Sequence, residues 1–171
     1  DFFKNFNDQI AIIDQNNNSY KYDELIDFDN KISQLSLTRA LVFCLCENNI
    51  ESVFGYFGFL ENNLVPVLLD SNIDNDLLNN LILKYKPVYL WKNKSLDFNY
   101  KLNELFSYGN YNLNQFDLYE FYKINESLNL LLSTSGSTGS SKFVRVTYNN
   151  LKSNAESIAD YLSIHNTEKP I

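Results

Sequence analysis

Apolar residues occur along the chain in two alternating patterns. Some form short continuous runs, as in residues 40–46 and 128–132, which is typical of strands buried on both faces of a sheet. Others recur every three or four positions, as Leu25, Phe28 and Ile32 do, which is typical of an amphipathic helix. This alternation predicts an α/β fold with a largely parallel sheet and helices between its strands. The predicted elements are a helix over 22–36, a strand over 40–46, helices over 50–61 and 74–86, strands over 88–91, 128–132 and 143–148, and a final helix that starts near Asn149.

Between residues 92 and 129 the pattern is mixed, because aromatic, Asn and acidic residues alternate without a steady period. Residues 108–112 predict a turn, and residues 116–122 predict a short strand or helix. No chemistry is identifiable in this stretch. The final helix is clearer, since it carries an apolar stripe made of Leu151, Ala155, Ile158, Ala159 and Leu162.

The helix over 50–61 contains two glycines, Gly55 and Gly58, spaced three residues apart. They predict close contact with a neighbouring element, because they share one face of the helix and lack a side chain. Phe54, Tyr56 and Phe57 stand beside them and supply bulk. We interpret this aromatic cluster as core packing, in preference to a ligand pocket.

A dense run of hydroxyl residues and glycines follows the strand predicted over 128–132 and ends at a lysine. The glycines allow the backbone to approach a ligand closely, so that several amide groups can converge on phosphate oxygens while the hydroxyls add donors. The lysine supplies a positive charge. The run therefore predicts a loop that binds the phosphates of a nucleotide. The candidate binding residues are Thr134, Ser135, Gly136, Ser137, Thr138, Gly139, Ser140 and Lys142.

Three other interpretations of this run compete with a phosphate loop. A flexible linker has a similar composition, although this run lies between two predicted strands. The P-loop G-x-x-x-x-G-K-[ST] is absent, because Ser141 stands where its second glycine belongs and Phe143 where Ser or Thr would hold magnesium. The dinucleotide pattern G-x-G-x-x-G is absent as well, because two residues separate the only two glycines of the run.

The segment TSGSTGSSKFVRVTY resembles the signature of the adenylate-forming superfamily, which is roughly [ST]-[ST]-G-[ST]-[ST]-G-x-P-K-G-V-x-x-[TS]-H. This superfamily contains acyl- and aryl-CoA ligases, adenylation domains of peptide synthetases and luciferase-like enzymes. Residues 134–139 match at every position, as do Lys142, Val144 and Thr147. The departures are Ser141 for the usual proline, Phe143 for the glycine after the lysine, and Tyr148 for the closing histidine.

The resemblance extends over nearly the whole chain. Residues 10–14 and 19–25 look like the strand, hairpin and helix with which the family domain opens. Residues 41–48 are similar to its next strand, residues 50–60 to the helix that follows, and residues 65–70 to a later strand. The order and spacing of these fragments imply that residues 1–171 are the N-terminal portion of an acyl-CoA synthetase-like domain, which ends after the phosphate loop and its following helix.

The resemblance implies a ligase that activates a carboxylic acid as an acyl-adenylate with ATP and Mg²⁺. Residues of the phosphate loop, with Lys142 as the cation, would hold the β and γ phosphates while charge builds on the departing pyrophosphate. CoA or a carrier protein is the expected acceptor in the parent enzyme. The identity of the acid stays open, because the segments that select it in the family follow the phosphate loop.

The family's adenine-binding and ribose-binding groups, its magnesium ligand and its catalytic lysine also follow the phosphate loop. We therefore expect residues 1–171 to lack adenylating activity on their own. An alternative is a non-catalytic module that uses an adenylation-like half fold to bind phosphate or a partner protein. A purely structural scaffold is a further alternative, and it predicts no stabilisation by nucleotide.

Composition restricts the classes of partner. The chain has 14 basic and 21 acidic side chains, a net charge of -7, and therefore repels nucleic acid at long range. The longest apolar stretch, residues 53–60, is too short to span a membrane, and we expect a cytoplasmic protein. A sheet cut partway through its domain leaves apolar surface uncovered, so we also expect self-association, detectable by sedimentation.

Cysteine and histidine offer little for redox or metal chemistry. Cys44 and Cys46 are predicted to point to the same face of a strand as reduced core residues, in a spacing that differs from C-x-x-C. His165 is the only histidine and lies in a polar tail. We predict no metal site in this chain.

Overall fold

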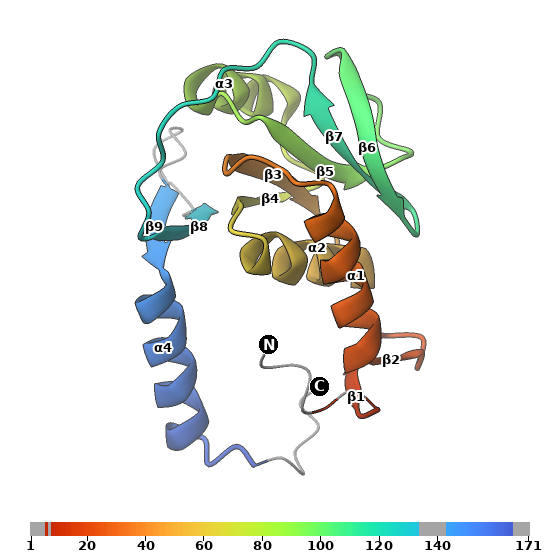
Figure 1. Cartoon of the computed structure of the whole chain (residues 1–171), viewed down its shortest axis with the longest axis vertical. Helices are drawn as coiled ribbons and strands as arrows, with labels where there is room; N and C mark the ends of the chain where they lie inside the picture. Colours follow the sequence, from red (N-terminus) through yellow and green to blue (C-terminus); the bar gives the residue numbers. More distant parts are fainter. Residues whose placement is uncertain (1–5, 7, 134–142, 166–171) are drawn as a thin grey trace.

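The structure is a computed structural model that describes residues 6, 8–133 and 143–165. Within these residues, seven strands form one sheet in the order β6-β7-β5-β3-β4-β8-β9, and β1 and β2 form a separate hairpin (Figure 1). The elements are β1 (Ile10–Ile13), β2 (Ser19–Lys21), α1 (Tyr22–Gln34), β3 (Leu41–Cys46), α2 (Ile50–Glu61), β4 (Val65–Asp70), α3 (Asn75–Tyr85), β5 (Tyr89–Asn93), β6 (Leu102–Tyr108), β7 (Tyr111–Phe116), β8 (Leu128–Ser133), β9 (Phe143–Thr147) and α4 (Tyr148–Tyr161).

The four central strands, β5, β3, β4 and β8, run parallel to one another. The predicted largely parallel α/β sheet is therefore confirmed at the centre of the fold. The sheet is mixed at both edges, because β7 pairs antiparallel with β5 and with β6, and β9 pairs antiparallel with β8.

Helices cover both faces of the sheet (Figure 1). Alternate residues of β3 point to opposite faces, so that Val42 and Cys44 join the core under α1 and α2, whereas Phe43 and Leu45 join the core under α3. Five of the six residues of β3 are buried. This explains why β3 is a continuous apolar run, with no alternation of apolar and polar residues.

The core under α1 and α2 contains the aromatic residues of the α2 helix. Phe54 is fully buried, and Phe57 packs against the same core from a partly buried position. Phe28 of α1 makes edge-to-face contacts with Phe54 and with Trp91 of β5. The interpretation of the aromatic cluster in α2 as core packing is confirmed for these side chains.

The hairpin of β6 and β7 lies in the stretch where the sequence shows no steady period. The turn predicted over residues 108–112 is present, and Gly109 occupies it with a positive φ of 54°. The flanking strands could not be predicted because polar residues occupy positions on both faces, with Asn112 and Asn114 on one face of β7 and Gln115 on the other. Asn114 is buried there, and its amide donates to the Asn112 side chain and backbone.

The expectation of a strand or helix over residues 116–122 is wrong. Phe116 is the last residue of β7, and residues 117–127 form no helix or strand. Contacts made by side chains hold this segment in place, because it does not pair with a strand. Lys101 and Lys86 pair with Asp117 and Glu120 respectively, and the Tyr122 hydroxyl donates to the backbone carbonyl of Tyr85 at 2.6 Å.

Helix α4 extends away from the sheet (Figure 1). It begins at a capping box in which Thr147 and Asn150 exchange hydrogen bonds. None of its residues is buried, and the predicted apolar stripe is largely exposed, with Ile158 at 46% and Leu162 at 60%. The expected self-association stays a prediction. No helix in the described part of the chain is long and apolar enough to cross a membrane.

We predict that Gly58→Ala destabilises the protein. A Cβ atom at Gly58 would lie 2.5 Å from Cε1 of Phe28, and the Phe28 ring is fixed by its aromatic neighbours. Overpacking of this kind costs about 1–3 kcal/mol, which outweighs the roughly 1 kcal/mol gain in helix propensity. Urea unfolding should show a lower midpoint for Gly58→Ala, whereas Ser33→Ala on the exposed face of α1 should stay close to the parent protein. An unchanged midpoint for Gly58→Ala would contradict the packing described here.

Candidate functional site at the carboxyl edge of the sheet

Strands β4 and β5 are added to the sheet on opposite sides of β3. The chain passes from β3 through α2 to β4, and then from β4 through α3 back to β5 on the other side of β3. The two connections leave toward opposite faces, because α2 and α3 lie on opposite sides (Figure 1). In parallel α/β sheets such a point opens a crevice at the carboxyl ends of the strands, where ligands bind.

A pocket of about 510 Å³ lies at this point. Its lining comes from the last residues of β3 and β4 and from the loops that follow them. The residues are Cys46, Glu47, Asn48, Leu68, Leu69, Asp70, Ser71 and Asn72. The crevice expected from the strand order is therefore present, with a polar lining.

The loop after β3 is held by the N-terminus of α2. The side chain of Asn49 caps this helix by accepting from the Ser52 amide at 3.0 Å. The Ser52 hydroxyl donates to the Asn49 oxygen at 2.8 Å and accepts from the Glu47 amide at 3.0 Å. The Glu47 carboxylate accepts from Asn49 and from Asn93 of β5. These bonds fix Glu47 at the edge of the pocket.

The loop after β4 is a tight turn closed by Asp70. Its carboxylate accepts from the Asn72 amide at 2.8 Å and from the Asn72 side chain at 3.2 Å. Asp74 then caps α3 by accepting from the Leu77 amide at 3.0 Å. Both α2 and α3 therefore begin at this edge, and helix N-termini favour negative charge.

Strand β8 lies beside β4 and is parallel to it, so its carboxyl end belongs to the same edge. Ser133, the last residue of β8, is paired with Phe143, the first residue of β9. The residues that flank the segment 134–142 therefore lie on adjacent strands at the edge that carries the pocket.

The predicted phosphate-binding residues themselves lie outside the described residues. These are Thr134, Ser135, Gly136, Ser137, Thr138, Gly139, Ser140 and Lys142.

The four residues at defined positions of the signature after Lys142 are described, namely Phe143, Val144, Thr147 and Tyr148. Val144 is half-exposed on β9 and pairs with Leu132. Thr147 is the N-cap of α4. Tyr148 donates its backbone amide to the Asn129 side chain at 3.1 Å and exposes 63% of its surface.

The described lining of the pocket carries carboxylates and no lysine or arginine. A phosphate here would need a cation from outside this lining. No group of three or more His, Cys, Asp and Glu side chains that could hold a metal ion occurs in the part of the chain that the structure describes. The absence of a metal site stays a prediction.

Cys46 is the most strongly perturbed group of the pocket lining. Burial raises its pKa to about 11, although a hydrogen bond with Ser52 opposes this change. Burial also raises the pKa of Cys44 well above its usual value. Both cysteines are free, in agreement with the prediction of reduced thiols, and the high pKa values make them weak nucleophiles.

Sequence reasoning missed the polar lining of the pocket, although a signal for it exists. Glu47 and Asn48 follow the buried strand β3 directly, and Ser71 and Asn72 follow β4. Polar residues just after two parallel strands indicate a shared edge. The strands must be known to be neighbours before this signal can be used.

Comparison with solved structures shows where this arrangement occurs elsewhere. O-succinylbenzoate coenzyme A synthetase from Bacillus subtilis, in complex with AMP, is similar with a TM-score of 0.68 and 18% identity, over 91% of this chain and 43% of that chain. The chain shares part of the acyl-CoA synthetase fold. MatB from Rhodopseudomonas palustris is similar with a TM-score of 0.65 and 15% identity, over 91% of this chain and 35% of that chain.

A fatty acyl-adenylate ligase from L. pneumophila, in complex with acyl adenylate and pyrophosphate, has a TM-score of 0.62 and 16% identity, over 87% of this chain and 29% of that chain. The B. subtilis synthetase has also been solved with ATP and magnesium ion. The chain spans less than half the length of each of these proteins. The sequence matches no family model and no curated protein.

We predict that ionisation of Cys46 weakens the fold at alkaline pH. The folded-state pKa is raised from 9.0 to about 11, so the fold favours the protonated thiol. This contribution to stability is fully present below pH 9 and is lost as the pH rises toward 11. The free energy of unfolding of the parent protein should therefore fall toward that of Cys46→Ala over this range. Urea unfolding of both proteins at several pH values measures the difference, and a difference independent of pH would rule out a buried thiol.

Proposed function

We propose that this chain is the phosphate-binding portion of an ATP-dependent ligase that activates a carboxylic acid as an acyl-adenylate. The observation that carries the proposal is the pairing of Ser133 with Phe143 at the carboxyl edge of the sheet. This pairing supports the proposal because the two residues that flank the Ser-, Thr- and Gly-rich segment 134–142 lie at the same edge of the sheet as the crevice between β3 and β4. A slack linker between domains would need no such pairing.

In the proposed reaction, the carboxylate of the acid attacks the α-phosphorus of ATP, and pyrophosphate leaves. Negative charge grows on the departing group, so donors aimed at the β and γ phosphates lower the barrier. We assign this task to the amides and hydroxyls of residues 134–140 and to the ammonium group of Lys142. Mg²⁺ is proposed to accompany ATP through its phosphate oxygens.

The electrostatics of the edge support this assignment of Lys142. Glu47 and Asp70 line the crevice, and their carboxylates repel a polyphosphate. The N-termini of α2 and α3 offset part of this repulsion, but each already has an acidic residue in its first turn. A phosphate tail at this edge therefore depends on a cation delivered by the loop.

The substrates are proposed as classes. The similar structures carry titles that mention AMP, acyl adenylate with pyrophosphate, and ATP with magnesium ion. We accordingly propose ATP and a small carboxylic acid as substrates, with CoA or a carrier protein as acceptor, of a longer ligase whose N-terminal portion is residues 1–171. We further propose that the protein is cytoplasmic.

A non-catalytic phosphate-binding module is the second candidate function. The departures from the signature favour this module. Tyr148 stands where the signature has a histidine, and its side chain is exposed at the end of β9. Both candidates use the same loop, and they differ only in whether a chemical step follows binding.

We predict that Lys142→Ala weakens the binding of inorganic pyrophosphate about tenfold, because one charge-assisted hydrogen bond to phosphate is lost. Isothermal titration of the 171-residue chain with pyrophosphate measures the affinity. Lys152→Ala is the matched control, since Lys152 is an exposed lysine on α4 that pairs only weakly with Glu156 at 3.8 Å. Equal affinities of the two variants would refute the assignment of the loop.

We also predict that residues 1–171 alone do not exchange pyrophosphate into ATP. The fold that they share with acyl-CoA synthetases covers under half of those proteins. Radiolabelled exchange in the presence of ATP, Mg²⁺ and a panel of aliphatic and aromatic acids measures this activity. Exchange above the level of Lys142→Ala would show that the chain holds a complete catalytic centre.

A further inference from the structure

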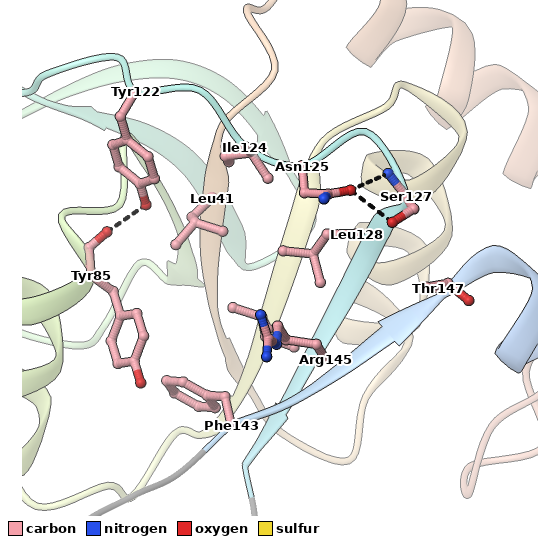
Figure 2. A pocket seen from close by; sticks show the side chains of 11 residues that line it. Leu41, Tyr85, Tyr122, Ile124, Asn125, Ser127, Leu128, Phe143, Arg145 and Thr147 are labelled. Atoms are coloured by element: carbon pink, nitrogen blue, oxygen red, sulfur yellow. Dashed lines mark hydrogen bonds between the residues drawn. The ribbon is translucent and has the colours of Figure 1, made fainter.

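A second cavity, of about 610 Å³, lies on the α3 face of the sheet beside β8 and β9 (Figure 2). Its lining is mostly apolar and aromatic and comes from β3, α3, the segment 117–127, β8 and β9. Tyr85 and Phe143 form one wall, with ring centroids 4.9 Å apart and an interplanar angle of 65°. Leu128 and Leu131 of β8 also line the cavity. The cavity is lined differently from the polar crevice between β3 and β4.

Hydrogen bonds fix the irregular wall of this cavity. The Tyr122 hydroxyl is bonded to the backbone of Tyr85, and Asn125 accepts from the amide and the hydroxyl of Ser127 at 2.9 and 2.7 Å (Figure 2). Arg39 donates to the backbone carbonyls of Asn125 at 3.1 Å and Leu128 at 2.5 Å. The segment 117–127 is therefore attached to α3 and to the start of β3, which makes the cavity a preformed feature.

Arg145 brings a positive charge to this apolar lining. Phe143, Arg145 and Thr147 alternate along β9 and all line the cavity, and Figure 2 shows the Arg145 guanidinium among Phe143 and Leu128. Within the described part of the chain, no carboxylate forms an ion pair with it. The chain has only one other arginine, Arg39, whose Nη1 and Nη2 atoms donate to backbone carbonyls and to the Asn63 side chain.

We propose that this cavity binds a small organic anion with an aromatic body. The guanidinium of Arg145 pairs with the carboxylate in a bidentate manner, and the body packs against Tyr85, Phe143 and Leu128. An aromatic ring can pack against the Tyr85 and Phe143 rings, and a carboxylate can pair with the exposed guanidinium of Arg145, which forms no ion pair with any other described residue. This site differs from the phosphate loop in its lining and in the chemistry of its ligand, and its test needs no nucleotide.

The test uses 2-naphthoate as the anion and 2-naphthamide as its uncharged counterpart. Titration of the ¹⁵N-labelled 171-residue chain, followed by amide NMR, reports both affinity and location. We expect saturable binding of 2-naphthoate with a Kd of about 0.1–1 mM, given its size. The shifts should concentrate at Leu128, Phe143 and Thr147, and 2-naphthamide should bind about tenfold more weakly.

Arg145→Gln should weaken 2-naphthoate binding about tenfold and remove the preference over 2-naphthamide. Arg145→Lys should fall in between, because it keeps the charge and loses the planar fork. Lys152→Gln removes one charge from an exposed site on α4 and should bind as the parent does. The proposal is overturned by an absence of saturation at 10 mM, by equal affinities of Arg145→Gln and the parent, or by an equal loss of binding in Lys152→Gln.

Discussion

Burial of β3 on both faces is the constraint on which the rest of the structure depends. A strand whose alternate residues all enter apolar cores needs helices above and below the sheet, and α2 and α3 supply them from opposite sides. The chain must then leave β3 and β4 in opposite directions. The crevice between the carboxyl ends of these strands is a geometric consequence of that burial, and so is the position of the polar loops after residues 46 and 70.

The antiparallel pair at the far edge has a different role. Strand β9 returns along β8 directly after the segment 134–142, so the sheet holds the two flanking residues, Ser133 and Phe143, side by side. The proposed phosphate site takes its backbone donors from the segment between them. The same hairpin places Phe143 and Arg145 on the α3 face, and one pair of strands thereby serves two proposed sites.

The two arginines illustrate how surroundings decide the role of a side chain. Arg39 is partly buried, and its guanidinium bonds to carbonyls of residues 63, 125 and 128, so it acts as a structural tie between the start of β3 and the irregular segment. Arg145 sits on an edge strand beside the cavity that this segment closes. Its side chain is exposed, and no carboxylate of the described residues forms an ion pair with it.

The sequence by itself determined the helices and strands whose apolar residues follow a regular spacing. The bounds of α2 and β3 and the run before the loop follow from apolar spacing and caps, because local periodicity and burial agree there. It did not reveal β6 and β7, because the alternation in β7 breaks between Asn114 and Gln115. These strands form because β7 pairs with β5, and β6 pairs with β7. Both pockets were likewise decided only by tertiary structure. Their linings join residues 46 with 70 and 85 with 145, and only strand order and helix placement bring such distant positions together.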